Sequence, residues 1–410
     1  MENPKIRFKG FTKDWEQRKL IDYLEVSSEK NRDNRFTKED VLSVSGEYGI
    51  VNQIEFQGRS FAGASVSNYG VVENGDVVYT KSPLKSNPYG IIKTNKGIPG
   101  IVSTLYAVYK PKEITDSKFV QIYFELDSRM NSYMHPLVNK GAKNDMKVSA
   151  ENALKGMVSF PKKDEQEMIS LYFSTLDHLI TLHQRKCEQT KKLKKYMLQK
   201  MFPQNGAKVP EIRFDGFTYD WEQRKLGDDL VSIHTGTNLL GSITNTGMPL
   251  IKMGNIQRGY FDTSKVEFLA ENEQPDKADI ANYGDFFFNT RNTLELVGKG
   301  ATWMKNSGEY AFNSNIARFE LRNLDTIFFN YLYNTDYMTK QIHARAMGTT
   351  SVAAIYPRTL DSVEYLAPCM KEQQKIGAYF KQLDHLITLH QRKCDELKKM
   401  KKYMLQNMFI

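Results

Sequence analysis

The chain repeats its own two ends. The segment PKIRFKGFTKDWEQRKL at 4–20 returns as PEIRFDGFTYDWEQRKL at 210–226, with 14 of 17 positions identical. The segment FSTLDHLITLHQRKCEQTKKLKKYMLQKMF at 173–202 returns as FKQLDHLITLHQRKCDELKKMKKYMLQNMF at 380–409, with 23 of 30 positions identical. The offsets, 206 and 207, are half of the 410-residue length within two residues. A duplicated frame around two different middles predicts one scaffold that presents two different binding surfaces.

The composition indicates a globular chain with a polyanionic partner. The 410 residues allow two or three domains with cores of their own. Three cysteines make no disulfide framework, no stretch reaches the roughly 20 apolar residues of a membrane helix, and no apolar run follows the N-terminus. These features predict a cytoplasmic protein. A net charge of +9 fits nucleic acid, although many soluble proteins are mildly basic.

The middles, roughly 21–160 and 227–367, both read as mixed domains rich in strands. Runs of β-branched and aromatic residues between Gly, Asn and Asp predict strands with tight turns. The clearest runs are Val77–Tyr79, Ala107–Tyr109, Phe286–Phe288 and Ile316–Phe319. Weak echoes, such as Asp116 before Phe119 and Asp325 before Phe328, indicate one α+β domain that kept its frame and changed its loops.

Each repeat ends in a predicted long helix. Residues 164–202 contain no Pro or Gly, and apolar residues recur there at spacings of three and four, as in a heptad seam. The predicted seam residues are Ile169, Phe173, Leu176, Ile180, His183 and Cys187, and in the second copy Ile376, Phe380, Leu383, Ile387, His390 and Cys394. At 1.5 Å per residue, such a helix is roughly 58 Å long. The two helices are expected to pack on each other.

An antiparallel pair is favoured, because the second globular domain starts where the first helix ends and the linker is short. The predicted fold class is α+β, with two globular domains joined by two long antiparallel coiled-coil helices in an internal pseudo-two-fold repeat. The predicted domains are 1–160, a first globular domain with its lead-in; 161–203, a spacer helix; 204–367, a linker, the repeated lead-in and a second globular domain; and 368–410, a C-terminal spacer helix.

The residues that catalysis requires are hard to find. The sequence contains no phosphate-binding Gly-x-x-x-x-Gly-Lys-Ser/Thr loop, no His-Glu-x-x-His and no paired Cys-x-x-Cys. Four of the seven histidines, His178, His183, His385 and His390, lie on the helices in pairs five residues apart, which do not share a helix face. No catalytic residue, no metal site and no cofactor is therefore predicted for this chain.

Polar and basic residues on predicted turns of the two middles are the candidates for DNA contact. Arg and Lys suit guanine edges, whereas Asn and Gln suit adenine edges. The candidates are Gln57, Arg59, Lys81, Lys85, Lys140, Lys143 and Asn144 in the first middle, and Lys252, Asn255, Gln257, Arg258, Thr290, Arg291, Asn292, Arg345, Thr349 and Thr350 in the second. Any one of these residues is more simply explained as a solvated surface residue. Where members of the set do contact DNA, most of their contacts are expected to go to phosphates.

Four motifs, each present twice, resemble the specificity subunit of type I restriction-modification systems. They are Trp-Glu-x-x-x-Leu at 15–20 and 221–226, Glu-Gln-x-x-Ile at 165–169 and 372–376, Leu-Asp-x-x-Ile at 176–180 and 383–387, and the lysine-rich helix ends before Tyr-Met-Leu-Gln. The resemblance spans the whole chain, including the order of the repeats.

The resemblance implies that each globular domain is a target recognition domain reading one half of a bipartite, asymmetric site in double-stranded DNA. The helices would set the gap between the halves and dock two modification (methyltransferase) subunits. Two restriction (translocase and nuclease) subunits would join them. S-adenosylmethionine, ATP and Mg would belong to those partners, and the assembled complex would be a DNA adenine methyltransferase and ATP-dependent endonuclease.

Three alternatives stay open. The chain could be a coiled-coil assembly adaptor whose heads bind proteins, an enzyme such as a nuclease in its own right, or an orphan subunit that serves methylation alone. Loss of all duplex binding would favour the first, and cleavage by the isolated chain would favour the second.

Overall fold

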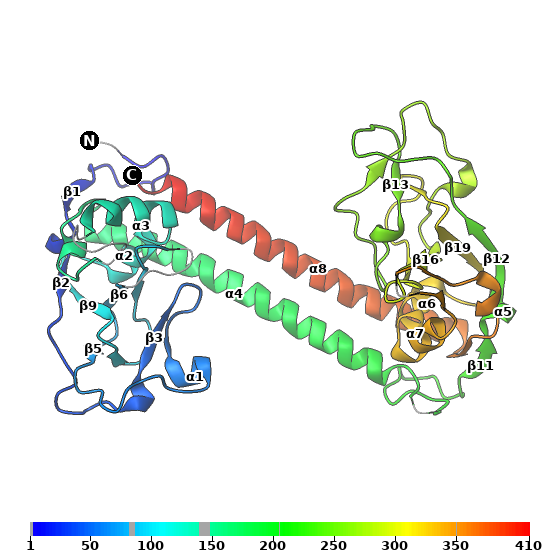
Figure 1. Cartoon of the computed structure of the whole chain (residues 1–410), viewed down its shortest axis with the longest axis horizontal. Helices are drawn as coiled ribbons and strands as arrows, with labels where there is room; N and C mark the ends of the chain where they lie inside the picture. Colours follow the sequence, from blue (N-terminus) through cyan, green and yellow to red (C-terminus); the bar gives the residue numbers. More distant parts are fainter. Residues whose placement is uncertain (1–2, 82–86, 139–147, 205, 350) are drawn as a thin grey trace. The chain divides into compact units, whose positions relative to one another are not determined.

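The computed structural model describes residues 3–81, 87–138, 148–204, 206–349 and 351–410, and the chain forms two compact units. The first unit comprises Met1–Gln184 with Arg392–Ile410, and the second comprises Arg185–Gln391. Both boundaries fall inside the two long helices, α4 (Lys163–Lys200) and α8 (Met370–Asn407), which Figure 1 labels. Each unit is therefore one globular head together with a segment of both helices.

The first head is built on a four-stranded antiparallel sheet in the order β2-β9-β6-β7. These strands are β2 (Leu24–Val26), β9 (Tyr106–Pro111), β6 (Val77–Thr80) and β7 (Ile92–Thr94). Antiparallel pairs join β1 (Glu16–Lys19) to β10 (Met157–Phe160), β3 (Leu42–Ser45) to β4 (Gly49–Asn52), and β5 (Gly70–Val72) to β8 (Gly100–Val102). The helices of this head are α1 (Gln53–Gln57), α2 (Ser117–Tyr123) and α3 (Asp127–Met134), with 3-10 turns at Leu20–Asp22, Lys38–Asp40, His135–Leu137 and Asn152–Leu154.

The second head repeats this plan with the antiparallel order β12-β19-β15-β17. These strands are β12 (Leu230–Thr235), β19 (Ile316–Leu321), β15 (Phe286–Asn289) and β17 (Gly300–Thr302). Around them lie the pair β11 (Glu222–Lys225) and β22 (Glu364–Ala367), the sheet β14 (Glu267–Phe268), β13 (Pro249–Ile251) and β18 (Ala311–Phe312), and the sheet β16 (Arg291–Asn292), β21 (Ala353–Ala354) and β20 (Met347–Gly348). The helices are α5 (Leu226–Asp229), α6 (Thr326–Tyr333) and α7 (Asp336–His343), with 3-10 turns at Met253–Asn255, Lys277–Asp279 and Pro357–Leu360.

The predicted α+β fold class is confirmed, and the heads share their frame. All four predicted runs lie in strands of the central sheets, namely β6, β9, β15 and β19. The repeated lead-ins form β1 and β11, which pair with β10 and β22. The two central sheets have the same strand order, so the difference between the heads lies in the outer strands and loops.

The weak sequence echoes mark the start of an equivalent helix in each head. The Asp116 side chain accepts hydrogen bonds from the backbone N–H groups of Lys118 and Phe119 at the start of α2. Asp325 accepts from the N–H of Phe328 at the start of α6. Asp is a preferred N-cap residue because its carboxylate satisfies N–H groups that have no partner within the helix. The two heads therefore keep an Asp at the start of this helix, although the residues around it differ.

The helix pairs run antiparallel within each unit. In the first unit, Phe173 of α4 lies 6.0 Å between ring centroids from Phe409, which follows the end of α8, and Asp177 binds Lys401 of α8 with Oδ1 and Nζ 2.7 Å apart. In the second unit, Phe202 lies 5.9 Å from Phe380, and the Nζ of Lys194 lies 2.5 Å from the Oδ1 of Asp384. Because numbers rise on one helix as they fall on the other, the pairing has the predicted direction.

Most of the predicted seam residues are buried between or beneath the helices. Ile169, Phe173, Leu176, Ile180, Cys187, Ile376, Phe380, Leu383 and Cys394 are buried, whereas His183, Ile387 and His390 are half-buried. Within the second unit, the Sγ of Cys187 lies 3.8 Å from the carbonyl oxygen of Ile387, which places α4 directly against α8 there. His178 and His385 are exposed, on the outer side of their helices.

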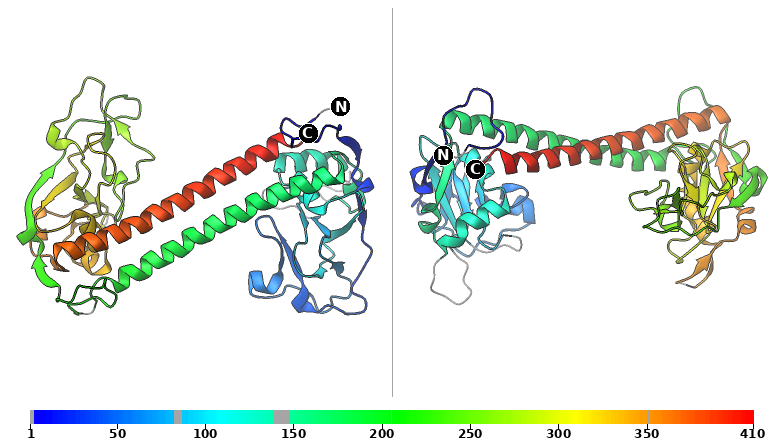
Figure 2. Two further views of the ribbon diagram at one scale, coloured as in Figure 1. Left: turned by 180° about the vertical axis from the view of Figure 1, so that it is seen from behind. Right: turned by 90° about the horizontal axis from the view of Figure 1, so that it is seen from above.

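Each head core closes around the last residues of the helix from the other repeat. The first core contains Trp15 together with Met408 and Phe409 of the C-terminal segment. The second core contains Trp221 together with Phe202, at the end of the first repeat. In both views of Figure 2 the N- and C-termini lie close together in the first unit, and the N–H of Ile6 donates to the carbonyl of Asn407 at 2.9 Å.

Candidate nucleic-acid interface

In the first head, the described candidates lie on exposed or half-buried loops. Gln57 ends α1 and is exposed, and the exposed Arg59 guanidinium lies 4.6 Å from the ring centroid of Phe61. Lys81 follows β6 and is half-buried, with its Nζ donating to the carbonyl of Thr104 at 2.7 Å. Burial lowers the pKa of Lys81, and the nearby Lys30 lowers it further. Arg59 therefore presents a cation on a flat aromatic support.

In the second head, Gln257 and Arg258 belong to one polar cluster beside α7. The Nη2 of Arg258 lies 2.9 Å from the Nε2 of His343, the last residue of α7. The Oε1 of Gln257 accepts from the Nζ of Lys299 at 2.7 Å. Burial lowers the pKa of both Lys299 and His343, and the Arg258 charge lowers both further. An anion beside Arg258 would relieve this repulsion.

The small sheet of β16, β21 and β20 gathers a second group of candidates. Arg291 is exposed and Asn292 half-buried on β16, which pairs with β21, while the exposed Thr349 follows β20 on the other side of β21. The hydroxyl of Thr290 donates to the carbonyl of Asn315 at 2.9 Å, and the Oδ1 of Asn292 accepts from the N–H of Thr293 at 2.8 Å. Arg291 is thus the long cationic side chain that this sheet presents to solvent.

Three candidates make contacts within the fold itself, and their contact with DNA stays a prediction. The Asn255 amide is buried, donates to the carbonyls of Asp262 and Lys265, and accepts from the N–H of Lys252. The Arg345 guanidinium donates to three carbonyls, those of Gln341, Thr359 and Ser362. Lys252 pairs with Glu267 at 2.5 Å. Turns need internal hydrogen bonds, and composition does not reveal which polar residues supply them.

Five candidates, Lys85, Lys140, Lys143, Asn144 and Thr350, lie outside the described residues. In the first head this leaves Gln57, Arg59 and Lys81 as the sequence-derived candidates that have a described position.

A groove at the junction of head and helices in each unit contains cations that, apart from Arg258, are not among the candidates derived from the sequence. The groove of the first unit, about 400 Å³, is lined by Lys93 and Lys96 from the head and by Lys398 and Lys401 from α8. The groove of the second unit, about 550 Å³, is lined by Arg258 and Lys305 from the head and by Lys194 and Lys381 from the helices. The sequence offers one signal for Lys93, since this charged residue directly follows the apolar pair Ile91 and Ile92.

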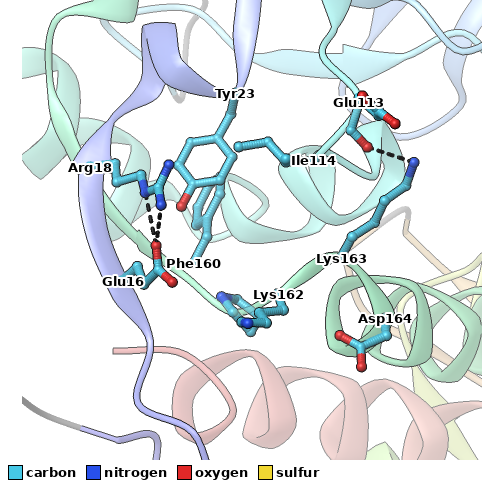
Figure 3. Close-up of a pocket in the computed structure, with 10 residues that line it drawn as sticks. Glu16, Arg18, Tyr23, Glu113, Ile114, Phe160, Lys162, Lys163 and Asp164 are labelled. Carbon is cyan, nitrogen blue, oxygen red and sulfur yellow. Dashed lines mark hydrogen bonds and ion pairs between the residues drawn. The ribbon is translucent and has the colours of Figure 1, made fainter.

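A third hollow, shown in Figure 3 and about 670 Å³ in volume, lies between the first lead-in and the start of α4. Its walls carry three carboxylates, Glu16, Glu113 and Asp164, and three cations, Arg18, Lys162 and Lys163. Arg18 pairs with Glu16, Lys163 donates to the carbonyl of Glu113 at 2.8 Å, and burial raises the pKa of Tyr23 to about 12. The balanced charge makes this hollow a poor site for a polyanion.

Metal and membrane chemistry receive no support from the geometry. Among the residues with a described position, no three His, Cys, Asp or Glu side chains gather closely enough to hold a metal ion. Within the same residues, none of the helices has both the length and the apolarity needed to cross a bilayer.

Comparisons with known proteins agree with the repeat and the fold. Residues 219–399 match the family model described as the type I restriction modification DNA specificity domain. The type I restriction enzyme MjaVIII specificity subunit of Methanocaldococcus jannaschii is 23% identical over 339 residues, covering 78% of this chain and 75% of that protein. Another protein of that organism, named provisionally as the specificity subunit of type I restriction enzyme MjaX, is 22% identical and covers 96% of this chain and 92% of its own.

The fold has a solved counterpart over its whole length. The crystal structure of the type I restriction-modification system S subunit from M. genitalium aligns with a TM-score of 0.59 and 12% identity, covering 100% of this chain and 99% of that one. Family domain, relatives and fold agree with the duplicated lead-ins, heads and helices described above. Residues 219–399 thus match the DNA specificity domain of type I restriction-modification systems, and the chain over most of its length is similar to the specificity subunits of those systems.

Proposed function

We propose that each head reads one half of a bipartite, asymmetric site in duplex DNA, and that α4 and α8 fix the gap between the halves. The observation that carries this proposal is a frame built twice with different surfaces. The central sheets have one strand order, yet the exposed cations differ, with Arg59 near α1 in the first head and Arg291 on β16 in the second. Two unlike surfaces on one frame suit two unlike half-sites.

The helices are suited to the spacing role because each is continuous through both units. α4 and α8 each span 38 residues, and each contributes to both units. Two weak DNA contacts joined by a stiff connector reinforce each other only on sites whose spacing matches. The gap is then a property of helix length, and the bases within it need no contact.

The test is selection of bound duplexes from a random pool, using the chain assembled with its modification subunits. The expected result is an enriched motif of two specified blocks separated by an unspecified gap of fixed length. Enrichment of one continuous block would contradict the two-headed reading. Absence of any enriched duplex would favour an assembly adaptor instead.

We further propose that the chain supplies recognition without chemistry, in the cytoplasm, and that two modification subunits dock on it, one per unit. Restriction subunits would join the same complex. S-adenosylmethionine, ATP and Mg would be bound by these partners, and the complex would methylate adenine and cleave DNA with ATP. The support for two equivalent docking sites comes from the outer face of the helices.

That outer face has an apolar stripe in both repeats. On α4, Leu182, Leu193 and Tyr196 are 36%, 45% and 49% exposed. Offsets of 11 and 14 residues keep them within roughly 60° of one another around a helix, whereas Cys187 of the seam lies about 140° from Leu182. Their counterparts on α8 are Leu389, Met400 and Tyr403, which are 49%, 47% and 57% exposed.

Each unit holds one complete set of these residues. The first unit contains Leu182, Met400 and Tyr403, and the second contains Leu389, Leu193 and Tyr196, which are their repeat equivalents. Exposed apolar side chains in a regular stripe mark a surface that another protein covers. Two equivalent sets, which differ only in Met400 against Leu193, suit two copies of one partner, which is the stoichiometry proposed.

Replacing Leu193 and Tyr196 together with aspartate is expected to remove one modification subunit from the complex and to leave the other bound. Loss of two anchors at the centre of such an interface costs about 2 kcal/mol or more, or about 30-fold in affinity. Native mass spectrometry of the assembled complex measures the stoichiometry. The matched control is Lys195→Asp on the same helix, for which both copies should remain. Two bound copies in the double variant would reject the stripe as the docking surface.

A further inference from the structure

The groove between head and helices in the first unit contains a buried lysine without a partner. Lys93, on β7, is only 9% exposed, yet it makes no hydrogen bond or ion pair with any described residue. It stands opposite Val78 in the sheet, on the face covered by the β3–β4 hairpin. Burial lowers its pKa, against the attraction of Glu125. A cation held this deep in a groove without a direct ion pair is stabilised further by an anion that enters the groove beside it.

The other groups in this groove leave room for that anion. Lys401 binds two carboxylates of the groove, with its Nζ 2.5 Å from Glu125 and 2.7 Å from Asp177, and the negative charge left over from this cluster acts on the nearby Lys93. Lys96 and Lys398 are exposed at the edges of the groove, and no carboxylate among the described residues pairs with either. The carboxylate of Glu47, at the tip of the β3–β4 hairpin, is the remaining negative group on the walls. The four lysines of the groove thus face three carboxylates, which leaves one net positive charge around a space of about 400 Å³.

The second unit has a groove at the equivalent place in its own frame. Thr94 and Thr302 line the two grooves, and their hydroxyls donate to the equivalent carbonyls of Ser117 and Thr326, both at 2.6 Å. Lys194 pairs with Asp384 there as Lys401 pairs with Asp177 in the first unit.

The remaining cations of the second groove are also uncompensated. They are Arg258, Lys305 and Lys381, and none of them has an ion pair with a described carboxylate. Arg258 contacts His343, Lys305 binds the hydroxyl of Thr263, and Lys381 binds the hydroxyl of Tyr283 at 2.7 Å. The two grooves therefore share their place and their surplus of positive charge, although the individual cations come from different positions.

We propose that the groove between head and helices in each unit binds backbone phosphates of duplex DNA, with Lys93 as the deepest phosphate ligand of the first unit. This inference rests on the proposed function, since it gives the recognition heads a site that positions DNA without reading its sequence. Phosphate contacts fix the register of a protein on the duplex, whereas base edges carry the specificity. One such groove per unit would hold the duplex once beside each half-site.

The test compares Lys93→Met with Lys93→Arg in the complete complex with modification subunits, on the duplex selected by the unmodified complex. Lys93→Met is expected to weaken binding roughly tenfold or more and to reduce the slope of log affinity against log salt by about 0.9. The selected motif should not change. Lys93→Arg should keep the slope. The control Lys155→Met removes an equal charge from an exposed site in the same head, where Nζ binds the Oδ1 of Asn152 at 2.8 Å, and should have little effect.

A duplex series in which single phosphates are replaced with neutral methylphosphonates locates the contact. Neutralising the phosphate at Lys93 should weaken the unmodified complex but have no further effect on Lys93→Met. Lys398→Met, on the exposed side of α8, provides a second variant that does not disturb the sheet, and it should also reduce the salt slope. If Lys93→Met and Lys398→Met both match Lys155→Met while the unmodified complex still selects its bipartite site, the inference is wrong and the proposed function stands. If the unmodified complex selects no duplex, both fail.

Discussion

Replacing Arg213 with methionine is expected to destabilise the second unit by about 3–5 kcal/mol. The Nε and Nη2 of Arg213 donate to the two carboxylate oxygens of Glu372 at 2.7 and 2.8 Å. The Glu372 side chain is only 1% exposed, so the substitution would leave a buried carboxylate without a counter-ion. This pair ties the lead-in to the first turn of α8, and its loss should loosen both.

The same pair exists in the first unit, where Arg7 binds Glu165 with both contacts at 2.7 Å. Arg7→Met should therefore have the same effect on the first unit. Hydrogen exchange followed by mass spectrometry during urea titration resolves the two units. Arg18→Met is the control, because Arg18 and Glu16 are 47% and 48% exposed and such a pair contributes about 0–1 kcal/mol. Equal losses for Arg213→Met and Arg18→Met would contradict the structural role of the buried pair.

Phe409→Ala is expected to destabilise the first unit by about 3–5 kcal/mol, the usual cost of removing a buried Phe. The Phe409 ring lies 5.7, 6.0 and 6.2 Å from the rings of Phe119, Phe173 and Trp15, measured between centroids. The guanidinium of Arg129 lies 4.7 Å from its centroid on another side. This side chain anchors the end of α8 in the core of the first head.

Phe202→Ala should reproduce the effect in the second unit, since Phe202 packs there against Trp221, Phe328 and Phe380. Thermal unfolding monitored unit by unit through hydrogen exchange measures both variants. Tyr403→Ala, at a position 57% exposed on α8, serves as control and should change the stability of the isolated chain by less than about 0.5 kcal/mol. A Phe409→Ala variant whose first unit unfolds at the wild-type temperature would show that the head does not depend on this helix end.

The helices and strands could be predicted because their signal is local periodicity. Spacings of three and four placed Phe173 and Phe380 on the buried side of their helices, and the run at Phe286–Phe288 is a buried strand. The antiparallel direction followed from chain connectivity. The strands of the lead-ins carry no such local signal, because β1 pairs with β10, which lies far along the chain.

The contacts that the candidate residues make within the fold could not be predicted, because the partner of a polar side chain can be a backbone group far away in the sequence. Asn255 and Arg345 look like surface residues in the sequence, but they satisfy carbonyl groups of the fold. In the sequence, Lys93 looks like an ordinary lysine of a strand. It lies in a groove only because α4, α8 and the β3–β4 hairpin surround it in the folded chain. Periodicity does not predict such long-range contacts.

The most direct test of the account is the random-pool selection repeated with an exchanged head. Residues 21–160 would be replaced by the corresponding segment of another specificity subunit, and the chimera would be assembled with the same modification subunits. The account predicts that one block of the enriched motif changes while the other block and the gap stay the same. Change in both blocks, or in neither, would contradict the claim that the two heads read the two half-sites independently.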